Sequence, residues 1–121
     1  MTLIGKSKEE ALNFARKDPF VNYMLSVQDD YLYEGTGIDP AKKKPIAENY
    51  FRGDLQASSS FITDEMLEAF TLLGTSDQVC DRILEYKKSG LNLPLLQPIS
   101  MKIEEISKVL ETGAMLIGAK N

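Results

Sequence analysis

Apolar positions recur every three or four residues over most of the chain, and this is the spacing of one face of an α-helix. The stretch Phe20, Met24, Val27 and Tyr31 is a clear example. Similar stretches precede and follow it, and each is bounded by a capping residue, a proline or a glycine. The pattern predicts a mainly α fold with five or six helices and at most one short strand.

Start and stop signals give the helices approximate bounds. The segments that carry both the apolar pattern and a boundary signal are residues 7–17, 18–34, 39–53, 63–73, 75–90 and 100 onward. Ser7 with Glu10, and Thr75 with Gln78, have capping-box spacing, in which two side chains satisfy free backbone amides at a helix start. Asp54–Ser60, with its three serines, is predicted to be a loop and the most mobile segment.

The last three of these helices each have an apolar face that is predicted to be buried. The faces are Met66, Leu67, Phe70 and Leu73; Val79, Cys80, Ile83 and Leu84; and Ile103, Ile106, Leu110 and Ile117. Gly74 is predicted to close the first of them, because glycine adopts the left-handed conformation of a helix C-terminus without steric cost.

One segment, Leu91–Ile99, departs from the helical pattern and is predicted to be the single short strand, although Pro94 removes a backbone donor. A strand needs a partner for its backbone groups. It is therefore extended and unpaired, or paired with a second copy of itself across a two-fold axis, or part of a larger sheet. A free apolar edge invites strand addition, so we expect a homo-oligomer, a dimer, formed by this strand or by another helical surface.

Composition narrows the class of protein. The 121 residues are predicted to form a single domain, residues 1–121, with the composition of a soluble globular protein. A net charge of −4 argues against a nucleic-acid partner, and no apolar run is long enough for a signal peptide or a membrane span. One cysteine, Cys80, excludes an internal disulfide and favours the cytoplasm. Because the chain has no histidine, no metal site is expected.

The best candidate for ligand binding is the start of the helix at residue 75. Gly74, Thr75 and Ser76 could bind an anionic part of a cofactor, since a helix N-terminus offers free amides and a positive dipole end. The alternative is plain capping, because Thr75 and Gln78 already use two of those donors.

The other polar clusters fit ordinary structural roles better than chemistry. Asp29, Asp30 and Glu34 fit a solvated helix face, Lys42–Lys44 a surface, and Cys80 a packed core. A catalytic thiol needs an activating base, usually histidine. No residue is predicted to be catalytic.

Residues 61–121 carry a family resemblance. A helix is followed by Gly74-Thr75-Ser76-Asp77, by a second helix that ends Tyr86-Lys87-Lys88-Ser89-Gly90, and by Leu91–Pro98 in the position of a last barrel strand. This order resembles the C-terminal part of the bacterial-luciferase-like oxidoreductases, which include the luciferase-like monooxygenases. It is especially similar to the deazaflavin-dependent methylene-tetrahydromethanopterin reductase branch.

The resemblance implies the last part of a TIM-like barrel that binds FMN or the deazaflavin coenzyme at the carboxyl ends of its strands. The chain lacks a counterpart of the first five or so strands, so it resembles a truncated oxidoreductase, flavin- or deazaflavin-dependent. Its chemistry would be hydride transfer by the cofactor, with a site completed by an oligomer or by a barrel-enzyme partner chain. The alternative is a non-catalytic helical protein that dimerises or docks on a partner.

Overall fold

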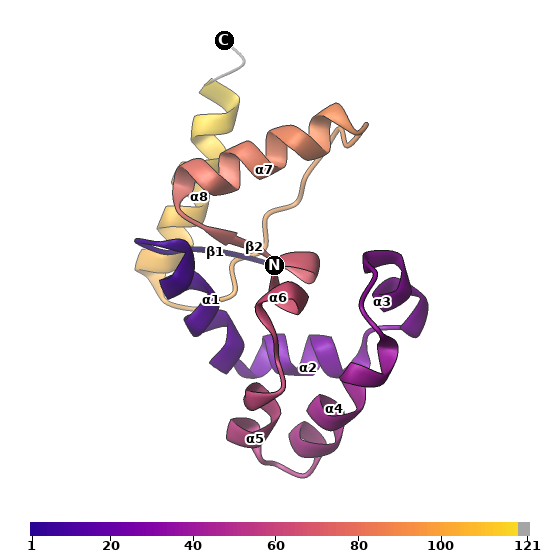
Figure 1. The fold of residues 1–121 in the computed structure, drawn as a ribbon. Helices are drawn as coiled ribbons and strands as arrows, with labels where there is room; N and C mark the ends of the chain where they lie inside the picture. The colour runs from indigo at the N-terminus through magenta and orange to yellow at the C-terminus, as the bar shows by residue number, and fades with distance from the viewer. Residues whose placement is uncertain (119–121) are drawn as a thin grey trace. The chain divides into compact units, whose positions relative to one another are not determined.

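The computed structural model describes residues 1–118 and divides into two compact units (Figure 1). Unit 1 combines residues 1–12 with residues 71–118, and unit 2 is the continuous stretch 13–70. Helix α1 (Lys8–Lys17) passes from one to the other. The prediction of a single domain over residues 1–121 stays a prediction. The mainly α fold is confirmed.

Unit 1 contains a small parallel sheet, with β1 (Thr2–Ile4) beside β2 (Leu72–Gly74) (Figure 1). Thr2 pairs with Leu72 on one side and forms an isolated parallel bridge to Pro98 on the other. The amide of Thr2 donates to the carbonyl of Gln97 at 2.6 Å, and the amide of Ile99 donates to the carbonyl of Thr2 at 3.0 Å. The two strands and residues 97–99 therefore run in the same direction, with β1 in the middle.

The prediction of a strand over Leu91–Ile99 is wrong. Only its end, at Pro98, pairs with a strand, and two three-residue strands that the pattern did not indicate form the sheet. Leu93 and Leu95 are 76% and 86% exposed, so the alternating leucines have no layer to pack against in unit 1. Strands of three residues are too short to show an alternation of apolar and polar residues. The first residues of β2 were therefore assigned to the end of the predicted helix 63–73.

Two helices cover the sheet of unit 1: α7 (Ser76–Lys88), which contacts β2, and α8 (Ile103–Gly118), which contacts β1 and α7. The buried side chains that they share with the sheet form one apolar core, made of Ile4, Val79, Ile83, Val109 and Leu116. No helix in the described part of the chain is both long and apolar enough to cross a membrane.

Two predicted buried faces of unit 1 are partly wrong. Leu84 is 40% exposed, whereas its neighbour Ile83 is fully buried. On α8 the buried residues are Val109, Thr112 and Leu116, while the predicted face of Ile103, Leu110 and Ile117 is 66–79% exposed. The reason is that α8 is apolar on two sides, and periodicity does not say which side meets the sheet.

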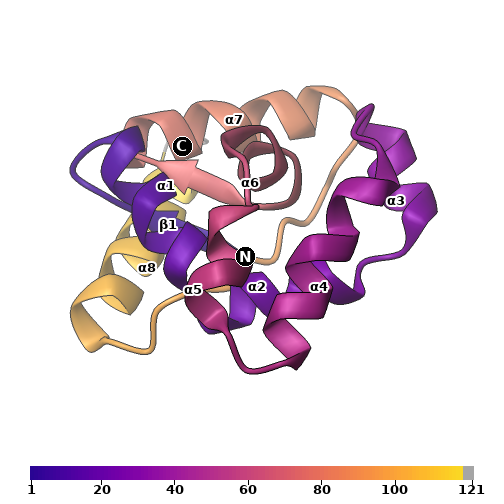
Figure 2. The ribbon, with the colours of Figure 1, turned by 60° about the horizontal axis from the view of Figure 1, so that its bottom comes forward.

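Unit 2 is built from short helices. They are α2 (Pro19–Val27), α3 (Asp30–Thr36), the 3₁₀ turn η1 (Pro40–Lys42), α4 (Lys43–Phe51), α5 (Leu55–Ser60) and α6 (Asp64–Phe70). Asp18 caps α2, as its position before Pro19 predicts, by accepting hydrogen bonds from the amides of Phe20 and Val21. Figure 2 shows α2, α4 and α5 packed together, and contacts among these three helices form the unit's centre.

Several elements of unit 2 differ from the predictions. The predicted helix 18–34 is two helices, because Gln28 and Asp29 are extended. The predicted loop Asp54–Ser60 is the capped helix α5, with Asp54 accepting from the amide of Ala57. The predicted helix 63–73 ends at Phe70.

A buried asparagine explains why the serine-rich stretch is ordered. The Asn22 side chain, which is fully buried, donates to the carbonyls of Arg16 and Asp18 at 2.9 and 2.8 Å. Its oxygen accepts from the hydroxyls of Ser58 and Ser59 at 2.8 and 3.3 Å. Buried polar groups cost free energy unless they are paired, so this network fixes α5 against α2.

Candidate functional site

The carboxyl edge of the sheet is the part of unit 1 where a ligand of a parallel α/β protein is expected. β1 ends at Ile4 and β2 at Gly74, and the amide of Gly5, the residue after β1, donates to the carbonyl of Gly74 at 2.9 Å. Each strand leads into a helix, α1 after Ser7 and α7 after Thr75. Two helix N-termini therefore begin at neighbouring strand ends.

Gly74 and Thr75 are held by the start of α7 itself. The Thr75 side chain accepts from the amide of Gln78 at 3.3 Å, and the Gln78 side chain accepts from the amide of Thr75 at 3.0 Å. The predicted capping box is therefore confirmed. Gly74 has φ 145°, and a Cβ there would lie 2.6 Å from Oε1 of Gln78. The positive φ and the close approach of the Gln78 side chain both account for glycine at this position.

The amides of Ser76 and Asp77 lie in the first turn of α7. The first amides of a helix have no hydrogen-bond partner within it, so these two are available at the helix start. The Ser76 hydroxyl lies 3.2 Å from the hydroxyl of Thr112 on α8. The exposed carboxylate of Asp77 adds negative charge beside these amides. This arrangement can receive one anionic group, and it is less favourable to anions than an uncharged helix start.

Cys80 follows in the same helix. Burial, and then the negative charges of Asp77 and Asp81, raise the pKa of its thiol. Its sulfur lies 3.8 Å from the carbonyl of Thr112. A thiol with a raised pKa is a weak nucleophile at neutral pH, in agreement with its predicted place in the packing.

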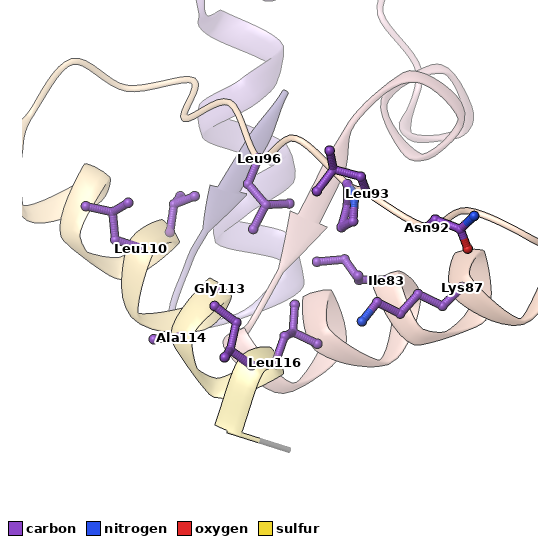
Figure 3. Close-up of a pocket in the computed structure, with 12 residues that line it drawn as sticks. Ile83, Lys87, Asn92, Leu93, Leu96, Leu110, Gly113, Ala114 and Leu116 are labelled. Atoms are coloured by element: carbon purple, nitrogen blue, oxygen red, sulfur yellow. The ribbon is translucent and has the colours of Figure 1, made fainter. Parts of the chain in front are cut away.

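An apolar pocket of about 440 Å³ opens on unit 1 between α7, α8 and the segment before Pro98 (Figure 3). Its walls are almost entirely aliphatic. The labelled lining residues in Figure 3 include Ile83, Leu93, Leu96, Leu110, Gly113 and Leu116. This pocket was not predicted from the sequence. The signal for it was the second apolar side of α8, which was assigned to the core instead.

The charged clusters of unit 2 take structural roles. Asp30 is paired with Lys43 at 2.5 Å, and the same ammonium donates to the carbonyl of Gln28 at 2.9 Å. One member of the acidic cluster and one of the lysine run thus hold the α2–α3 break together. Within residues 1–118 no group of three or more carboxylate, cysteine or histidine side chains gathers in a way that could hold a metal ion.

Comparison with known proteins gives sequence matches to one kind of enzyme. A 5,10-methylenetetrahydromethanopterin reductase of Methanopyrus kandleri is 31% identical over 88 residues, which are 73% of this chain and 25% of that protein. The reductase of the same name from Methanolobus tindarius is 32% identical over 100 residues, which are 81% of this chain and 30% of that protein. No family model matches the chain.

The fold comparison agrees. The structure of the coenzyme F420-dependent tetrahydromethanopterin reductase from Methanopyrus kandleri superposes with a TM-score of 0.75 and 27% identity, covering 90% of this chain and 31% of that one. The resemblance found in residues 61–121 is therefore confirmed, as is the likeness to part of a TIM-like barrel oxidoreductase. The chain spans only about a quarter to a third of these relatives. Monooxygenase chemistry and FMN, implied by the wider resemblance, stay predictions.

Proposed function

We propose that this chain, which is similar in sequence and fold to part of the 5,10-methylenetetrahydromethanopterin reductases, is one part of a deazaflavin-linked oxidoreductase. The fold match over 90% of the chain is the observation that carries the proposal. The proposed reaction class is hydride transfer, which the cofactor supplies when bound. No side chain of this chain is assigned a catalytic role.

The chain's own part would be to bind and orient one end of the cofactor. The amides at the start of α7, beside Gly74, Thr75 and Ser76, fit a phosphate group on the carboxyl edge of the sheet. The two paired strands form only an arc of a barrel. The remaining wall of the site would come from a second copy of this chain, in a homodimer, or from a barrel-enzyme partner chain. We also propose the cytoplasm as its compartment, on the evidence of the single cysteine.

A fluorescence titration of the purified chain with the deazaflavin coenzyme and with FMN tests this proposal. We expect saturable binding at micromolar concentration, tighter for the deazaflavin coenzyme. Absence of binding of either compound, at a protein concentration where the chain is oligomeric, would contradict it.

A charge variant locates the binding. Ser76→Asp should weaken binding of either cofactor at least fivefold, because its carboxylate stands where the phosphate is proposed. The same carboxylate should leave α7 intact, since a negative charge is favourable at a helix N-terminus. Ser89→Asp, at the other end of α7, adds the same charge away from the site and should leave affinity unchanged. Equal affinities for both variants would contradict the proposed position.

The second candidate function is non-catalytic dimerisation or docking on a partner. The exposed apolar side chains of α8 favour it, because large exposed apolar patches mark interaction surfaces. The titration separates the two functions, since a docking protein has no affinity for either cofactor.

A further inference from the structure

We draw no further inference here: the strongest candidate, the apolar pocket between α7, α8 and the segment before Pro98, opens onto the exposed outer face of α8, and nothing in residues 1–118, which the structure describes, shows what covers it.

Discussion

The two units hold their short helices and strands together with different kinds of core. Unit 1 packs two helices on a small sheet through aliphatic side chains such as Ile83 and Val109. Unit 2 places a polar residue, Asn22, at the centre of its helices and satisfies it with serine hydroxyls and carbonyls. The difference teaches that an apolar core tolerates apolar replacements of similar volume, whereas a polar centre depends on every partner being present.

The largest expected effect is on the apolar core. Ile83→Ala should lower the free energy of unfolding by about 2–5 kcal/mol, because it leaves a cavity among side chains that cannot fully collapse. Urea unfolding followed by circular dichroism measures it. Leu84→Ala, one position along and 40% exposed, is the control and should cost under about 1 kcal/mol. Equal costs would mean that α7 faces the sheet differently.

The next largest effect is on the polar centre of unit 2. Asn22→Ala should cost about 3 kcal/mol, because two carbonyls and two hydroxyls lose a buried partner at once. Asn13→Ala removes an exposed hydrogen bond to Arg16 and should cost under about 0.5 kcal/mol in the same urea experiment. A loss at Asn22 no greater than that at Asn13 would show that water replaces the network.

Features that depend on neighbours within a few residues could be predicted from the sequence, and features whose partners are distant could not. The capping box at Thr75 and the cap at Asp18 involve neighbours within three residues, so spacing predicted both. Ser58 and Ser59 were predicted to lie in a loop because their partner, Asn22, is 36 and 37 residues away. Both units show this, since the pairing of Thr2 with Leu72 and Pro98 was equally invisible to periodicity.

The candidate site follows the same rule. Gly74, Thr75 and Ser76 could be predicted as a helix start from their spacing, and the structure brings them to a strand end. The pocket beside α8 could not be predicted, because it depends on which of two apolar sides of that helix meets the sheet. The resemblance over residues 61–121 was confirmed even though some helix faces were predicted wrongly. It depends on the order of several motifs along the chain and not on which side of a helix is buried.

The smallest expected effect concerns a buried tyrosine in unit 2. The hydroxyl of Tyr33 donates to the carbonyl of Leu25 at 2.6 Å, and its ring packs on Phe70 with centroids 4.8 Å apart. Tyr33→Phe should cost about 1 kcal/mol at neutral pH, because the carbonyl of Leu25 loses its donor. Phe70→Leu, which keeps that hydrogen bond, is the comparison that separates ring packing from the donor.

The same tyrosine gives unit 2 a pH dependence. Burial raises the pKa of Tyr33 from its ordinary value of 10.0 to about 12. The unfolded chain therefore loses this proton first, and the stability contributed by neutral Tyr33 is present below pH 10 and is lost as the pH rises toward 12. Urea unfolding between about pH 9 and pH 11 should show wild type losing stability relative to Tyr33→Phe. Parallel curves would contradict a buried hydroxyl.

The position of β1 between β2 and residues 97–99 has a consequence for the order in which the protein is made. A ribosome that has released residue 70 has released all of unit 2, whose contacts are then available to form. The first strand, although synthesised earliest, must wait until Ile99 emerges before both of its neighbours exist. Contacts that span most of a chain are slow to close and leave their edges open meanwhile. During synthesis the middle of this sequence is therefore expected to fold first, with its beginning and end joining last.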